Sequence, residues 1–308
     1  MLKQQSYKFV LLAGLLILLP FFFYGGPAYH SPRSYMAIWN LGHILFFMLF
    51  VCYLKMRADE FTWLWALKVC CLVVGLGILI EIIQSGIDGR TASSSDVVRD
   101  FMGAVLGTVW VSWKRLSWQG KGGAAIIVGA IMIWNLYPVS IALVDEWQAR
   151  EEFPLLAGFE NSCELSRWGG DATMQRSQEQ VRQGKFSLRL SLTTATYSGI
   201  HFEHFPRDWR GFDSLRFSLY NGDILPLSVT VRVHDRKHEQ GQQRYTDRFN
   251  RTFVLRHGWN DLKINLSDIQ NAPKNRRMDL SEIRGLGIFV IRQSEKKVVY
   301  LDDVRLVN

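Results

Sequence analysis

Cysteine is scarce in this sequence, and this scarcity argues against two classes of protein. The chain has four cysteines among 308 residues. There is no CxxC pair and no Cys/His spacing, so neither a zinc site nor a disulfide framework is expected. Cys52, Cys70 and Cys71 lie in hydrophobic stretches, where a thiol usually serves as a small packing residue, and Cys163 stands alone in the polar half.

Runs of one charge and familiar catalytic motifs are also missing. The chain has 36 Lys and Arg residues against 28 Asp and Glu residues, and the basic residues are spread over both halves. Because they form no run, nucleic acid is not an expected partner, whereas a mild positive excess suits anionic lipid headgroups. The polar half has no GxSxG motif, no phosphate-binding loop and no paired catalytic carboxylates.

The sequence does have a sharp division near residue 146. Before it, five apolar stretches are long enough, or nearly so, to cross a bilayer, which takes about 20 helical residues. They cover residues 9–24, 36–54, 62–83, 97–113 and 124–144. We therefore predict an α-helical membrane bundle of about five helices over residues 1–146, a short charged linker at 147–154, and a separate domain at 155–308.

Basic residues near the helix ends predict the orientation of this bundle. Cytoplasmic ends of membrane helices carry an excess of Lys and Arg. Here such residues gather at alternate ends of the stretches: Lys3, Lys8, Lys55, Arg57, Lys114, Arg115 and Lys121. The N-terminus is thus expected in the cytoplasm, and five crossings put the C-terminal domain on the other side of the membrane.

Several polar side chains lie in the membrane half, where charge is costly. They are His43, Glu81, Gln84, Arg90, Asp96 and Asp100. Glu81 and Gln84 are three positions apart, so they share one helical face. In the expected orientation all six lie at one depth near the outer surface. They form either a candidate acid/base cluster or a structural cluster of polar groups that only holds three short helices together.

The order of these residues carries a resemblance to a known family. The segments Asn40-Leu-Gly-His43, Glu81-Ile-Ile-Gln84, Arg90, Ser95-Asp96 and Asp100-Phe-Met-Gly103 with Gly107 resemble the VanZ-like membrane proteins over roughly residues 30–115. Two positions depart from that pattern, since members often carry Asp at Asn40 and Asn at Asp100. The resemblance implies a bacterial envelope protein of the cell (inner) membrane and assigns no reaction. Gly103 and Gly107 also form a GxxxG pattern, which predicts close helix packing.

Residues 155–308 alternate with the period of two that is typical of half-buried strands. The candidate strands cover residues 187–192, 199–203, 214–220, 228–234, 250–255, 261–266, 286–291 and 299–306. Turn residues such as Asn221-Gly222-Asp223 and His257-Gly258 separate them. Eight strands at this spacing predict an all-β jelly-roll sandwich.

The ends of this domain carry a second resemblance. Gly158-Phe159-Glu160 opens it and Tyr300-Leu-Asp302-Asp303-Val304 closes it, as in a galactose-binding-like jelly roll of the carbohydrate-binding-module type. The resemblance implies a structural calcium at Glu160 and Asp303, unless Asp302 and Asp303 are only solvated charges at a strand end. A sugar-binding face combines aromatic rings with hydrogen-bonding side chains, and the candidates are Tyr197, His201, Arg232, Asp235, Tyr245, Arg248 and Asn250.

Two functions remain open from the sequence. In the first, the chain is a non-enzymatic envelope protein whose outer domain recognises an envelope glycan or a lipid-linked sugar, with membrane lipid as its other partner. In the second, it is an enzyme acting on a lipid headgroup or lipid-linked substrate, with His43 or a carboxylate as the base and Arg90 holding a phosphate. A transporter is disfavoured, because five short helices and one outer cluster supply no path across the membrane.

Overall fold

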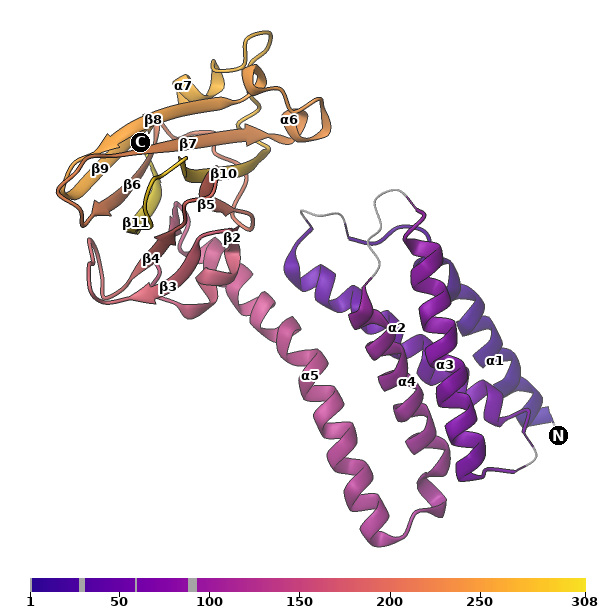
Figure 1. Ribbon diagram of the computed structural model, residues 1–308. Coiled ribbons are helices and arrows are strands. Elements are labelled where there is room, and N and C mark those ends of the chain that lie inside the picture. Colours follow the sequence, from indigo (N-terminus) through magenta and orange to yellow (C-terminus); the bar gives the residue numbers. More distant parts are fainter. Residues whose placement is uncertain (1, 28–30, 59, 88–92) are drawn as a thin grey trace. The chain divides into compact units, whose positions relative to one another are not determined.

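The chain forms two compact units, Met1–Leu143 and Val144–Asn308. The computed structural model describes residues 2–27, 31–58, 60–87 and 93–308 (Figure 1). The first unit is helical and the second is built mainly from strands, so the predicted fold class is confirmed. Arg90 of the predicted cluster lies outside the described residues.

The helical unit contains α1 (Leu2–Leu18), α2 (Arg33–Lys55), α3 (Trp63–Gln84), α4 (Ser94–Ser112) and most of α5 (Trp118–Glu151). Among the described residues, α2, α3 and α5 are long and apolar enough to cross a bilayer, and the apolar segment Ser6–Phe22 is shorter. Helix α4 has three charged residues in its first two turns, Asp96, Arg99 and Asp100, which lowers its hydropathy. The protein is therefore a membrane protein, and each of the five predicted stretches overlaps a helix of the structure.

Small residues bring α4 close to α2. Figure 1 shows α1 to α4 side by side, with α2 contacting α1 and α4. A Cβ added to Gly103 would lie 2.5 Å from the backbone oxygen of Ile44, and one added to Gly107 would lie 2.8 Å from Val51 Cβ. The close packing predicted from the GxxxG pattern is thus present, and α2 is the helix that packs against these glycines of α4.

The second unit is a sandwich of two antiparallel sheets. The six-stranded sheet has the order β3-β4-β11-β6-β9 with β1 beside β11, and the five-stranded sheet has the order β2-β5-β10-β7-β8. The strands are β1 (Leu155–Ala157), β2 (Trp168–Gly170), β3 (Thr173–Ser177), β4 (Ser187–Leu192), β5 (Tyr197–Phe202), β6 (Ser214–Asn221), β7 (Leu227–Asp235), β8 (Phe249–Leu255), β9 (Gly258–Asn265), β10 (Ile283–Ile291) and β11 (Lys297–Val307). All eight predicted strands are present. Strands β1 to β3, which have three to five residues each, and the short helices α6 (Arg236–Gln240) and α7 (Leu266–Gln270) were not predicted.

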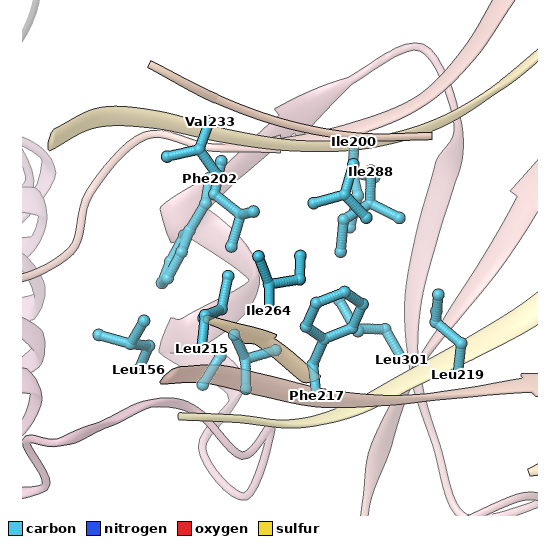
Figure 2. Close-up of a cluster of buried hydrophobic side chains, with 14 of the residues drawn as sticks. Leu156, Ile200, Phe202, Leu215, Phe217, Leu219, Val233, Ile264, Ile288 and Leu301 are labelled. Atoms are coloured by element: carbon cyan, nitrogen blue, oxygen red, sulfur yellow. The ribbon is translucent and has the colours of Figure 1, made fainter. Parts of the chain in front are cut away.

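The core of the sandwich lies between the inner faces of the two sheets (Figure 2). Phe202 and Ile288 come from the five-stranded sheet, and Leu215, Phe217 and Leu301 come from the other. Alternation along each strand then sends the intervening residues to the outer face. On β7, for example, Val231 and Val233 are buried while the residue between them, Arg232, points away from the core.

The predicted linker at 147–154 needs a correction, because α5 continues to Glu151. The last turns of α5 belong to the second unit and are held there by a buried ion pair. Arg167 Nε donates to both carboxylate oxygens of Asp145 at 3.0 and 3.1 Å. This partner lies 22 positions further along the chain, so the local charge pattern that suggests a linker does not reveal it.

Candidate functional site

The outer face of the five-stranded sheet carries a pocket of about 630 Å³. Tyr197, His201, Arg232 and Arg248 supply its aromatic and hydrogen-bonding groups, and glycines supply part of its floor. The pocket therefore brings together side chains from β5 and β7 and from the residue that precedes β8.

The strand register explains why these side chains meet. His201 on β5 lies opposite Gly287 on β10, and Gly287 lies opposite Arg232 on β7. A Cβ added to Gly287 would lie 3.5 Å from Arg232 Nε, so the Arg232 side chain lies close to the backbone of β10. A larger side chain at Gly287 would fill the space between the imidazole and the guanidinium, and glycine leaves it open.

Hydrogen bonds hold the β5 side of the pocket. His201 Nε2 lies 2.6 Å from Glu203 Oε1. Asp171, which also lines the pocket, accepts the N–H of Gly199 at 2.8 Å. Asp171 and Phe289 were not predicted for this site. Asp171 follows β2, which pairs with β5, and Phe289 lies opposite Gly199 in the register of β5 and β10.

Four of the seven predicted sugar-contact residues line this pocket, and three do not. Asn250 lies opposite Arg232 in the β7–β8 register and donates to the backbone oxygen of Tyr245 at 3.3 Å. Tyr245 is exposed, and the Arg248 guanidinium lies 5.5 Å from the centre of its ring. Both residues are therefore neighbours of the pocket.

Asp235 has a structural role instead. Its carboxylate is fully buried, accepts the N–H of His238 at the start of α6, and accepts two hydrogen bonds from Arg276 at 2.6 and 2.8 Å. Burial acts to raise its pKa, but the hydrogen bonds from Arg276 and from backbone N–H groups outweigh burial and keep the pKa below its ordinary value. A carboxylate satisfied in this way holds the end of β7 and has no free face for a ligand.

The two residues expected to hold calcium are engaged with protein donors. Glu160 Oε1 accepts the N–H groups of Lys185 and Phe186 at 2.7 and 3.0 Å, and the Asp303 carboxylate pairs with Arg305. Within the part of the chain that the structure describes, no three His, Cys, Asp or Glu residues form a metal-binding group. Calcium takes six to eight oxygen ligands, and both carboxylates are already engaged with protein donors, so calcium at Glu160 and Asp303 stays a prediction.

Asp302, next to Asp303, is not a solvated charge. It is fully buried, and its Oδ2 accepts the N–H groups of Arg182 and Gln183 at 2.7 and 3.0 Å. Burial raises its pKa despite these bonds. The residue thus ties the loop before β4 to β11, a role that its position beside Asp303 does not indicate.

In the helical unit, the structure joins His43 to the predicted carboxylates of α4. His43 Nδ1 lies 2.8 Å from Asp100 Oδ1, and His43 Nε2 lies 3.9 Å from Asp96 Oδ2. Asp96 also pairs with Arg99 on the same helix. If Nδ1 carries the proton that binds Asp100, Nε2 is left as the basic nitrogen.

Two other predicted members of this cluster, Glu81 and Gln84, are buried and bind backbone groups. Glu81 accepts the backbone N–H of Ser93, the residue before α4, and Gln84 donates to the backbone oxygen of Phe22 at 2.7 Å. Gln84 therefore joins α3 to the end of the first helical segment. Glu81 Oε1 and Asp100 Oδ2 are buried and have no hydrogen-bond partner among the described residues.

An apolar cavity of about 400 Å³ lies beside His43. Phe22, Trp39 and Leu45 are among its lining residues, and the His43 imidazole contributes to its wall. The Phe22 ring meets the imidazole edge-on at 4.8 Å between centroids. The arrangement combines an imidazole held by a carboxylate with a space that suits an apolar chain.

The comparisons with known proteins find different matches for the two units. No curated protein matches the sequence. The second unit is similar to the family 11 carbohydrate-binding module of Clostridium thermocellum in complex with a β-1,3-1,4-mixed-linked tetrasaccharide, at 12% identity over 50% of this chain and 94% of the module, with a TM-score of 0.40. It is also similar to an exo-β-agarase, at 18% identity over 49% of this chain and 24% of the agarase, with a TM-score of 0.39.

The helical unit matches a family model. The match to VanZ/LLP1 covers residues 3–115, which include α1 to α4 and the motifs on which the resemblance was based. The description of the second unit as a β-sandwich rests on its own strand order. Residues 3–115 thus match the VanZ/LLP1 family model, and α5 joins them to a separate β-sandwich.

Proposed function

We propose that this chain is a bacterial inner-membrane protein whose β-sandwich lies outside the cytoplasm and binds an envelope glycan or a lipid-linked sugar. The observation that carries the proposal is the pocket of about 630 Å³ lined by Tyr197, His201, Arg232 and Arg248. Its volume falls in the usual range for small-molecule sites, about 300–1,000 Å³.

The lining suits a sugar in two ways. The Tyr197 ring is 63% exposed at the pocket and meets Phe289 edge-on at 6.0 Å between centroids. An exposed ring offers a flat apolar surface for the C–H face of a pyranose. The imidazole and guanidinium groups of His201 and Arg232 supply hydrogen bonds for hydroxyl and ring oxygens.

The proposed location of the β-sandwich outside the cytoplasm rests on the distribution of basic residues near the helix ends. Lys55 ends α2 and Arg57 follows it, and Lys114 and Arg115 follow α4, at ends that would share the cytoplasmic side with the N-terminus. Digestion of spheroplasts with an external protease tests this arrangement. The sandwich should be degraded in intact spheroplasts, whereas protection until the membrane is opened would place it in the cytoplasm and contradict the proposal.

Glycan binding is tested with the full-length protein in lipid nanodiscs on an array of envelope oligosaccharides. Replacing Tyr197 by Ala should weaken binding about tenfold, because a stacked aromatic residue at the centre of a site typically contributes more than 1 kcal/mol. Tyr220→Ala is the matched control, since Tyr220 lies on the other sheet and packs against Trp259. Equal effects of the two substitutions, or no binding to any envelope glycan, would contradict the proposal.

A second candidate function is catalysis in the helical unit. The observation that favours it is the buried His43–Asp100 pair beside an apolar cavity of about 400 Å³. There the imidazole would act as general base on a lipid headgroup or lipid-linked substrate whose apolar chain occupies the cavity. The lipid profiles of cells with the wild-type protein, with His43→Gln and without the protein test this role.

In that test, His43→Gln keeps a hydrogen-bonding side chain toward Asp100 but cannot act as a base at neutral pH. Catalysis predicts that the variant inserts normally and gives the lipid profile of the deletion strain. A deletion strain with unchanged lipids, or a His43→Gln profile like wild type, would leave the pair a structural link between α2 and α4.

A further inference from the structure

We infer that the ligand of the pocket on the five-stranded sheet carries an anionic group, a carboxylate or a phosphate, held jointly by Arg232 and Arg248. The inference deepens the proposed glycan-binding function and rests on it. It concerns the β7–β8 side of the pocket, where these two residues meet.

The two arginines share one face of the sheet. Arg232 on β7 lies opposite Asn250 on β8, and Arg248 precedes Asn250 by two residues, so alternation sends its side chain to the same side. Both line the pocket. They lie close enough for the charge of Arg248 to add to burial in lowering the pKa of Arg232.

Neither guanidinium has an anionic partner among the described residues. Their Nε atoms are buried and have no hydrogen-bond partner there. Other arginines of the sandwich are paired, as Arg251 is with Asp268 at 2.9 Å and Arg284 is with Glu282 at 2.9 Å. Two adjacent like charges with unused buried donors are costly, and a bound anion removes both the repulsion and the unsatisfied donors.

The acidic groups of the pocket do not neutralise this pair. Asp171 binds the N–H of Gly199 and the hydroxyl of Thr193, at 2.8 and 3.4 Å. Glu203, which follows β5 and does not itself line the pocket, is paired with His201. The pocket is therefore polarised, with the carboxylate of Asp171 held on the β5 side and the two cationic groups on the β7–β8 side.

This polarity orients a ligand. Its pyranose ring would lie on Tyr197 and its anionic substituent would reach the two guanidinium groups, where a carboxylate or phosphate accepts bidentate hydrogen bonds. A neutral sugar would satisfy some donors through its hydroxyl groups but would leave both charges uncompensated. The site should therefore prefer an acidic sugar over a neutral one of the same shape.

Two matched pairs of probes test the preference on the full-length protein in nanodiscs of zwitterionic lipid. One pair is tetragalacturonate and its uncharged methyl ester, and the other is N-acetylglucosamine 6-phosphate and N-acetylglucosamine. The anionic member of at least one pair should bind at least tenfold more tightly at low salt, with a difference that shrinks as salt increases. The pair that shows the difference identifies a carboxylate or a phosphate as the recognised group.

The variants separate charge recognition from folding. Arg232→Gln and Arg248→Gln should each reduce the preference, and the double variant should abolish it while its thermal unfolding stays like that of the wild type. Arg251→Gln is the control, because Arg251 belongs to β8 but pairs with Asp268 and does not line the pocket.

Two results would overturn the inference, and they differ. If charged and neutral members bind equally and Tyr197→Ala weakens both, the pocket binds glycans without selecting an anion. If none of the four probes binds and the protein also binds no glycan on the array, the proposed function fails together with the inference.

Discussion

His43 on α2 and Asp100 on α4 are 57 positions apart in the chain, yet His43 Nδ1 lies 2.8 Å from Asp100 Oδ1. Asp100 is fully buried and its side chain also packs against α3, since a Cβ added to Gly77 would lie 2.6 Å from Asp100 Oδ2. The pair therefore connects the three helices that carry the VanZ/LLP1 motifs.

Breaking this pair should destabilise the helical unit. Asp100→Leu would leave the buried imidazole N–H without its acceptor, and such a change typically costs up to about 3 kcal/mol. Asp100→Asn keeps an oxygen that accepts a hydrogen bond, so its cost should be nearer 1 kcal/mol. Thermal unfolding of the full-length protein in detergent, followed by tryptophan fluorescence, measures the difference, and equal effects of the two substitutions would contradict it.

The contact between α4 and α2 should not tolerate a larger side chain. Gly103→Val would place Cβ 2.5 Å from the backbone oxygen of Ile44, and overpacking of this kind usually costs about 1–3 kcal/mol. Gly75→Ala on α3 is the control, because a Cβ there has no neighbour within 4 Å. The control should unfold at or above the wild-type temperature, and a Gly103→Val variant that does the same would rule out tight packing.

Arg276 should make the sandwich sensitive to acid. Its guanidinium lowers the pKa of Asp247 below the ordinary value of 3.8 and pairs with the buried Asp235. A carboxylate with a lowered pKa stabilises the fold above its ordinary pKa and loses that effect as the pH falls through the lowered value. Arg276→Gln should therefore cost about 3 kcal/mol at neutral pH, because it leaves buried Asp235 unpaired, and much less near pH 2.

Hydrogen exchange of residues 235–247 in the full-length protein, at pH 7 and at acid pH, measures this effect. Arg210→Gln is the control. Arg210 lowers the pKa of Asp208 to about 2, but both side chains are largely exposed, so their pair should contribute little to stability. Equal exchange in the two variants at pH 7 would contradict the assignment.

The end of α5 should depend on Arg167. Arg167→Leu would leave Asp145 as a buried unpaired charge, at a cost of about 3–5 kcal/mol, whereas adding Asp145→Leu should restore most of the loss. Faster hydrogen exchange of residues 144–151 in the single variant, and its reversal in the double variant, are the expected results. Arg150→Leu, at an exposed position of the same helix, should leave exchange unchanged.

Much of the architecture could be predicted from local pattern. Apolar stretches of membrane length predicted all five helices, and alternation predicted eight strands, including Ser187–Leu192 with its observed ends. The strands β1 to β3 were missed because three to five residues carry too little alternation to be recognised. The prediction of a linker was wrong because the charged residues before 152 are equally compatible with a helix. Arg167, which pairs with Asp145 and holds the end of that helix, lies further along the chain.

The candidate sites show where sequence reasoning ends. Helical spacing put Asp96 and Asp100 on one face, but it did not reveal that Asp100 is the partner of His43 or that Gln84 binds the backbone of Phe22 instead. In the sandwich, residue type selected Asp235 together with Arg232, although the first is a buried cap of α6 and only the second lines the pocket.

The sequence by itself determined the division into a membrane half and a β-rich half, the kind of element in each segment and the motifs of the VanZ/LLP1 region, because hydropathy and side-chain periodicity are local properties. Only the tertiary structure decided which side chains meet. Strand order and register bring Arg232, Gly287 and His201 into one row, and helix packing brings His43 to Asp100. These contacts join residues far apart in the chain. They form because burial of the apolar faces drives the fold, and the polar groups that are buried with those faces must find partners there.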